Sequence, residues 1–145
     1  MKLKVKKLNP RAILPKKATE SASGYDLFAC IDEGSITLNK DADPQMVPTG
    51  IAIETPPGFD AQIRPRSGLS LKGVGVTFGT IDSDYRGELK VTMYLFGGKK
   101  SFTVNHGDRI AQLVIARLAD TMIEEVEDLT PTGRGAGGHG STGMK

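Results

Sequence analysis

The sequence predicts an all-β fold of short antiparallel strands, arranged as a sandwich, jelly roll or barrel. Apolar and polar residues alternate over short runs that recur at a spacing of roughly ten residues, which is typical of such strands. The 18 glycines and 8 prolines supply the turns that so many strands need. No series of long amphipathic helices is present, which argues against a doubly wound α/β fold. The 145 residues suffice for one domain with a hydrophobic core.

The strands are expected at regular intervals along the chain. The first covers residues 2–8, where lysines alternate with apolar side chains until Asn9 and Pro10 end the pattern. A turn rich in proline and glycine at 56–58 separates two later strands. The remaining early and late strands are expected at residues 25–29, 35–38, 45–48, 51–55, 59–64, 101–104 and 109–116.

A single short helix is expected, at residues 67–72. Ser67 can act as its N-cap, and Leu69 and Leu71 favour helical structure. The segment is long enough for only one or two turns, so the prediction is an all-β fold with at most one short helix.

Residues 79–88 form a polar stretch between two strand-like segments, 74–78 and 89–96. Two β-rich segments joined by a polar turn predict a β-hairpin. The turn contains Asp82 and Tyr85, and the local evidence by itself favours a solvated turn without a function.

Composition indicates a soluble globular protein. Hydrophobic residues make up 38% and charged residues 25% of the chain, and no apolar run could span a membrane. We expect no signal peptide and no nucleic-acid partner, because the basic N-terminus lacks an apolar region and the net charge is only +2. The one cysteine, Cys30, excludes an intrachain disulfide, so we expect a cytoplasmic protein with Cys30 buried as a small hydrophobe.

The C-terminal residues 119–145 are expected to form an arm beyond a β core at 1–118. Residues 120–128 are acidic and are interpreted as a solvated connection. Residues 132–143 are rich in glycine, cannot bury apolar surface and should be disordered in the free protein. Such a segment can also bend its amides around an anion, and the residues alone leave both interpretations open.

Five polar segments lie in or next to the expected loops, at 21–27, 64–70, 79–88, 107–112 and 132–143. Together they supply arginine, serine, glutamine and backbone amides, which bind phosphate, and aspartate, which can serve a water or a metal ion. The chain has no zinc-ligand spacing and no Walker or dinucleotide-binding motif.

These five segments, in this order, resemble the five motifs of the trimeric deoxyuridine triphosphatases (dUTP nucleotidohydrolases, dUTPases). The matching stretches are ASGYDL at 22–27, PRSG at 65–68, GTIDSDYRGE at 79–88, RIAQ at 109–112 and RGAGGHGSTG at 134–143. Each motif alone is a weak signal, whereas five in register over nearly the whole chain are a specific one.

The resemblance implies a distorted jelly roll of the β-clip type with a flexible C-terminal arm. It implies a homotrimer with active sites shared between subunits, in which the arm reaches over a neighbour. The implied reaction is Mg²⁺-dependent hydrolysis of dUTP at the α-phosphorus to dUMP and pyrophosphate, which keeps uracil out of DNA and supplies dUMP for dTMP synthesis.

The resemblance also implies a role for each matched residue. Asp82 corresponds to the catalytic acid that orients the attacking water. Tyr85 corresponds to the ring that packs on deoxyribose and excludes a 2′-hydroxyl by steric clash. Asp26 corresponds to the acid that holds Mg²⁺ through water. The phosphate-binding positions are Arg66, Ser67, Gly68, Gln112, Arg134, Ser141 and Thr142. The base- and sugar-binding positions are Val76, Gly79, Thr80, Ile81, Asp82, Tyr85 and His139.

Three features of the motifs qualify this assignment. His139 stands where the family usually has a phenylalanine that stacks on uracil, which predicts weaker, pH-dependent stacking. Val76 stands where many members have asparagine, so uracil would be recognised by main-chain groups between Val76 and Ile81. Asp84 and Arg86 are expected to pair with each other or with solvent and not to take part in catalysis.

Three alternatives remain open from the sequence. A deoxycytidine triphosphate deaminase shares the fold but needs a glutamate base near Thr92, and residues 91–96 contain no carboxylate. A regulator that binds dUTP or a protein without turnover would not need the full set of catalytic-type residues. A structural, capsid-like jelly roll would not need Asp82, Tyr85 and Gln112 in register.

Overall fold

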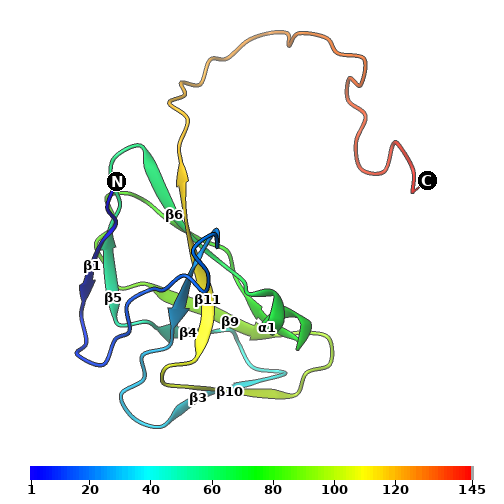
Figure 1. The fold of residues 1–145 in the computed structure, drawn as a ribbon. Helices are drawn as coiled ribbons and strands as arrows, with labels where there is room; N and C mark the ends of the chain where they lie inside the picture. Colours follow the sequence, from blue (N-terminus) through cyan, green and yellow to red (C-terminus); the bar gives the residue numbers. More distant parts are fainter. Residues whose placement is uncertain (145) are drawn as a thin grey trace.

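The computed structural model describes residues 1–144 and confirms an all-β fold with one short helix (Figure 1). No helix among these residues is long and apolar enough to cross a membrane. The elements in this part of the chain are β1 (Lys4–Lys7), β2 (Tyr25–Phe28), β3 (Ser35–Asn39), β4 (Gln45–Pro48), β5 (Ile51–Glu54), β6 (Phe59–Arg64), α1 (Ser67–Leu71), β7 (Val74–Val76), β8 (Gly79–Ile81), β9 (Lys90–Leu95), β10 (Ser101–Asn105) and β11 (Arg109–Arg117).

The strands pair in four antiparallel sheets. Their orders are β2-β11-β6-β8, β4-β9-β7, β1-β5 and β10-β3. None of these paired strands follows its partner directly in the chain, so pairing brings distant segments together. The longest strand, β11, lies between β2 and β6, which places the fourth predicted motif directly beside the first.

The predicted hairpin is confirmed in part and corrected in part. β7 pairs with β9, with Val76 opposite Met93, as the flanking segments predicted. However, Gly79–Ile81 is not turn but strand β8, which pairs with β6 in the neighbouring sheet. A strand of three residues is too short to show a period of two, so its pairing could not be seen in the sequence.

The helix forms where it was predicted, but its expected cap was wrong. Arg66 occupies the N-cap position without a side-chain capping bond, and Ser67 is already the first helical residue. The backbone of Arg66 is extended, with φ −99° and ψ 133°, which starts the helix one residue earlier than a Ser67 cap would. Ser67 is therefore left exposed at the surface.

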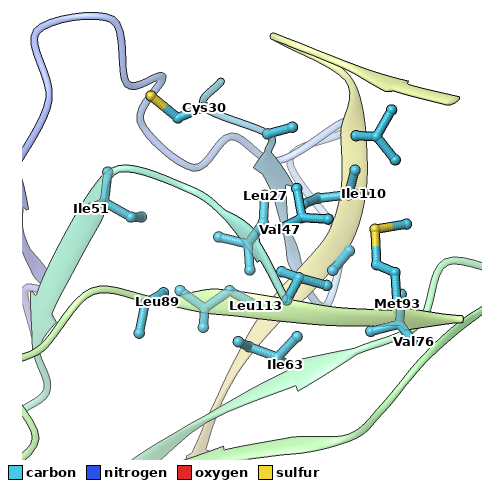
Figure 2. Close-up of a cluster of buried hydrophobic side chains, with 14 of the residues drawn as sticks. Leu27, Cys30, Val47, Ile51, Ile63, Val76, Leu89, Met93, Ile110 and Leu113 are labelled. Atoms are coloured by element: carbon cyan, nitrogen blue, oxygen red, sulfur yellow. The ribbon is translucent and has the colours of Figure 1, made fainter. Parts of the chain in front are cut away.

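The core lies between the sheets and collects the apolar side of each strand (Figure 2). Leu27, Val47, Met93 and Leu113 come from four different strands and are at most 1% exposed. Cys30 lies at the edge of this cluster and is buried, as predicted. Burial raises the pKa of its thiol, and the nearby carboxylate of Asp32 raises it further.

Beyond β11, residues 118–144 contain neither helix nor strand. This segment leaves the end of β11 and runs away from the sheets, so that its last described residues lie far from the core (Figure 1). Several of its apolar side chains are strongly exposed, including Met122 at 95%, Ile123 at 103% and Leu129 at 86%. None of these three side chains packs against the core of the same chain.

Candidate active site

The site begins with Asp26 and Gln112, which face each other on neighbouring strands. Gln112 of β11 lies opposite Asp26 of β2 and opposite Arg64 of β6. Directly opposite residues of an antiparallel pair project from the same face of the sheet. The next residues along, Leu27 and Leu113, are buried on the other face. Strand alternation therefore places both polar side chains on the face away from the core.

Two arginines surround the carboxylate of Asp26. Arg66 Nε lies 3.4 Å from Asp26 Oδ1, and Arg109 Nη1 lies 3.6 Å from Asp26 Oδ2. Arg66 Nη1 also donates a hydrogen bond of 3.0 Å to the carbonyl oxygen of Arg109. The side chain of Asp26 is only 14% exposed, whereas those of the arginines are 33% and 54% exposed. One acid thus holds two cationic groups at a surface where an anion can reach them.

Gln112 is held beside this group by two close contacts. Its Nε2 donates to the carbonyl oxygen of Pro65 over 2.9 Å. Gly24, just before β2, leaves room for it, since a β-carbon there would lie 2.7 Å from Gln112 Oε1. Ser67 and Gly68 follow Arg66 and are exposed at the start of α1. The first two predicted motifs and the fourth are therefore brought together.

A second group of predicted residues lies on β8 and the turn that follows it. Thr80, Ile81, Asp82 and Tyr85 line one hollow together with Glu88 and neighbouring side chains. The Tyr85 amide donates to the Asp82 carbonyl over 3.0 Å, and the phenol of Tyr85 donates to the Glu88 carbonyl over 3.1 Å. Asp82 is exposed, so its carboxylate is open to solvent.

The tight fold of this turn depends on Gly87. A β-carbon at that position would lie 2.5 Å from Tyr85 Cζ, because the ring lies across the turn. The ring remains 45% exposed. Glycine at 87 thus makes room for the tyrosine ring, whose hydroxyl is held by the carbonyl of Glu88 while the residue stays partly exposed.

Val76 can contact a bound ligand only through its main chain. Its side chain is 3% exposed and belongs to the core. The Thr77 amide donates to the Thr92 carbonyl over 3.0 Å, so the antiparallel alternation turns the N–H and C=O of Val76 away from β9. β8 is also the edge strand of its sheet, so half of its main-chain groups point away from β6 and have no strand partner among residues 1–144.

The tail residues form a third group, separate from the other two. Arg134 Nε donates to the Gly137 carbonyl over 2.6 Å, and the Ser141 amide donates to the Gly138 carbonyl over 3.1 Å. Arg134, His139, Ser141 and Thr142 are all exposed. His139 has a φ of 50°, in the left-handed region that usually favours glycine. The tail therefore folds on itself here.

Within one chain, the predicted residues do not meet in one cleft. Arg66 and Arg109 line one hollow, Asp82 and Tyr85 line another, and the tail residues line neither. No role was predicted for Arg109 from the sequence, although this residue begins the fourth motif, RIAQ. Its contact with Asp26 depends on the pairing of β11 with β2, which no local pattern shows.

Arg86 also has a partner that was not predicted. It does not pair with Asp84; instead its Nη2 lies 3.4 Å from Glu54 Oε1 on β5. A hydrogen bond from Lys4 lowers the pKa of Glu54, and the charges of Lys4 and Arg86 add to this effect. Glu54 lay in an expected strand and carried no motif signal.

Comparison with known proteins identifies close relatives over the full length. The model of the family described as dUTPase matches residues 10–143. The deoxyuridine 5′-triphosphate nucleotidohydrolase of Gloeothece citriformis is 52% identical over 147 aligned residues, which cover 99% of this chain and 98% of that protein. The protein of the same name from Hydrogenobaculum sp. is 50% identical, with 100% of both chains covered. A structure of the Staphylococcus bacteriophage 80alpha dUTPase with dUPNHPP is similar at a TM-score of 0.86 and 26% identity, covering 99% of each chain.

Proposed function

The chain belongs to the dUTPase family, and we propose that it hydrolyses dUTP at the α-phosphorus to give dUMP and pyrophosphate. The observation that carries the proposal is the grouping of Asp26, Arg66 and Gln112, which come from three segments far apart in the sequence. Arginines and a glutamine amide beside an acid suit a polyphosphate that carries a hydrated cation.

In the proposed reaction, the carboxylate of Asp82 orients a water molecule and takes up its proton as the water oxygen attacks the α-phosphorus. The bond from the α-phosphorus to the bridging oxygen breaks, and pyrophosphate leaves with the electron pair. Arg66, Gln112 and the amides of Ser67 and Gly68 bind the phosphates and hold the α-phosphorus in line with the water.

The base and the sugar of the nucleotide would be bound by the second group of residues, on β8 and the turn that follows it. The outward main-chain groups of Val76 and the open edge of Gly79–Ile81 can form hydrogen bonds to one edge of uracil. Along that edge, cytosine has an acceptor where uracil has a donor and a donor where uracil has an acceptor. The main-chain groups that bind uracil therefore disfavour cytosine. The exposed ring of Tyr85 can pack against the deoxyribose and leave no space for a 2′-hydroxyl.

Mg²⁺ is the cofactor proposed for this site. Among residues 1–144, no three histidine, cysteine, aspartate or glutamate side chains are grouped closely enough to hold a metal ion. Mg²⁺ usually keeps several waters and binds substrate phosphates with only one or two carboxylates, so Asp26 fits it as a single acid acting through water. When bound, the ion neutralises charge on the phosphates.

We infer that the working unit is a homotrimer in which sites are shared. Two features support this inference: the two groups of site residues line different hollows of one chain, and the apolar side chains of the arm are exposed. A second subunit would bring its Asp82 and Tyr85 to the phosphate group of the first. The tail, with Arg134, Ser141 and Thr142, would then close over the phosphates.

A substrate screen tests the activity. The protein is mixed with dUTP, dCTP, dTTP or UTP and Mg²⁺, and pyrophosphate and ammonia are measured. We expect pyrophosphate from dUTP alone, lost in Asp82→Asn and kept in the matched control Asp84→Asn, whose exposed acid lies two residues away. Ammonia from dCTP would support the deaminase instead, and binding of dUTP without turnover would support the regulator.

Mixed subunits test the shared site. Asp82→Asn and Gln112→Ala are each inactive alone, because each damages a different group. When the two variants are unfolded and refolded together, a shared site regains activity wherever an intact Asp82 meets an intact Gln112 from another subunit. If the mixture stays inactive although native mass spectrometry, which resolves the mass difference between the two variants, shows mixed trimers, each site lies within one chain.

A further inference from the structure

Arg86 lies at the end of the turn that carries Asp82 and Tyr85, and it links this turn to another sheet. We propose that Arg86, held by Glu54, is a positioning residue that fixes this turn and thereby sets both the attacking water and the sugar contact. The inference rests on the proposed function for its kinetic consequences, but its structural part can be tested without any activity.

The contacts of Arg86 are directed at the backbone of the turn. Its Nη1 donates to the Ser83 carbonyl over 2.7 Å and to the Tyr85 carbonyl over 3.1 Å. Ser83 directly follows Asp82, so the guanidinium holds the chain just after Asp82 and again at Tyr85. The turn has one internal backbone bond, from the Tyr85 amide to Asp82, which is too little to define its shape alone.

Glu54 provides the fixed point for this contact. It ends β5, whose Ile51, Ala52 and Ile53 are buried in the core. The second oxygen of Glu54, Oε2, lies 3.1 Å from Lys4 Nζ on the paired strand β1. The Arg86 Nη2 contact to Oε1, at 3.4 Å, therefore ties an exposed turn to a strand that cannot move independently of the core.

The energetics of the ion pair indicate that Arg86 positions the turn more than it stabilises the folded protein. The side chains of Arg86 and Glu54 are 53% and 45% exposed, and exposed ion pairs contribute little to folding stability. By contrast, a small displacement of a catalytic group can slow a reaction substantially. Arginine also suits this position better than lysine, because its planar fork can reach two carbonyls and a carboxylate at once.

The test uses Arg86→Met, Arg86→Lys, Glu54→Gln and the double variant Arg86→Met with Glu54→Gln. Lys6→Met is the matched control, because Lys6 lines the same hollow as Arg86 and carries the same charge, but makes no ion pair among residues 1–144. Three quantities are measured in the full-length protein: amide hydrogen exchange over residues 82–88, kcat and KM for dUTP, and the ratio of kcat/KM for dUTP to that for UTP.

We expect faster exchange at residues 82–88 in Arg86→Met, with the thermal midpoint nearly unchanged. Its kcat should fall about tenfold while KM changes little, and its discrimination against UTP should also weaken because Tyr85 no longer holds its place. Arg86→Lys should recover only part of each effect. The double variant should resemble Arg86→Met, since both changes break one linkage.

Unchanged exchange and unchanged discrimination in a folded Arg86→Met would overturn the inference, as would equal effects of Lys6→Met. Should Arg86→Met fail to fold, Glu54→Gln and Arg86→Lys decide by the same readouts. If the unaltered protein does not hydrolyse dUTP, the proposed function fails, while the exchange measurement still decides whether Arg86 fixes the turn.

Discussion

Gln112 occupies the space that a side chain at Gly24 would need: a β-carbon at position 24 would lie 2.7 Å from Gln112 Oε1 and 3.3 Å from Gln112 Cβ. The two residues belong to the first and fourth motifs and are 88 positions apart in the numbering. Because the Gln112 amide also donates to Pro65, the position of this side chain depends on two other motifs at once.

Gly24→Ala should therefore displace Gln112 and break its bond to Pro65. Overpacking of this kind costs about 1–3 kcal/mol of unfolding free energy, and phosphate binding should weaken with it. Urea unfolding and KM for dUTP measure the two effects. Adding Gln112→Ala should restore part of the lost stability but none of the binding; if it restores no stability, the two side chains do not compete for this space.

Asp26→Asn should change the dependence of activity on Mg²⁺. The substitution keeps the shape of the side chain but removes the charge that would attract the hydrated ion and that balances Arg66 and Arg109. The Mg²⁺ concentration for half-maximal activity should rise about 10- to 100-fold, the range seen when groups that act on a metal through another ligand are removed.

A titration of activity with Mg²⁺ after treatment with a chelator measures this change. The exposed acid Asp41, which makes no ion pair among the residues described, supplies the control Asp41→Asn. An unchanged Mg²⁺ requirement in Asp26→Asn would mean that this acid does not serve the ion.

His139→Phe should improve substrate binding. A phenyl ring offers more aromatic area to a stacked base than imidazole does, and the gain expected for an aromatic pair corresponds to a roughly 2- to 10-fold lower KM. Steady-state kinetics with dUTP provide the measurement, with His139→Ala, which should raise KM, as the opposite comparison. A KM for His139→Phe that is equal to or above that of the unaltered protein would refute stacking at this position.

The contribution of Glu54 to stability should depend on pH. Contacts with Lys4, and then with Arg86, lower the pKa of this carboxyl from its ordinary 4.5, so the folded state favours the charged form. The stabilisation is therefore complete above about pH 4.5 and is lost as the pH falls through the lower folded pKa. Urea unfolding of the unaltered protein and of Glu54→Gln from about pH 7 to about pH 3 should show a small difference in stability that shrinks only in the acid range, because the ion pairs of Glu54 are exposed. A difference that stays constant would exclude the linkage.

Much of the fold was visible in the sequence because each strand needs only local information. Alternation located strands such as Lys4–Lys7, Ser35–Asn39 and Phe59–Arg64, and turn residues located the ends of others. Prediction failed where the local signal is short or absent. β8 spans three residues, and the N-cap at Arg66 lacks the side-chain bond on which cap prediction depends.

By itself, the sequence determined the all-β class, the five motifs and hence the family, since these follow from residue types and their order. Only the tertiary structure decided which motifs meet: β11 pairs with β2, so Gln112 and Arg109 lie beside Asp26, whereas Asp82 lies at a different hollow. It also decided that Arg86 pairs with Glu54 and not with nearby Asp84. The physical reason is that contacts between distant segments depend on strand pairing over long separations, and no local pattern of side chains specifies which strands pair.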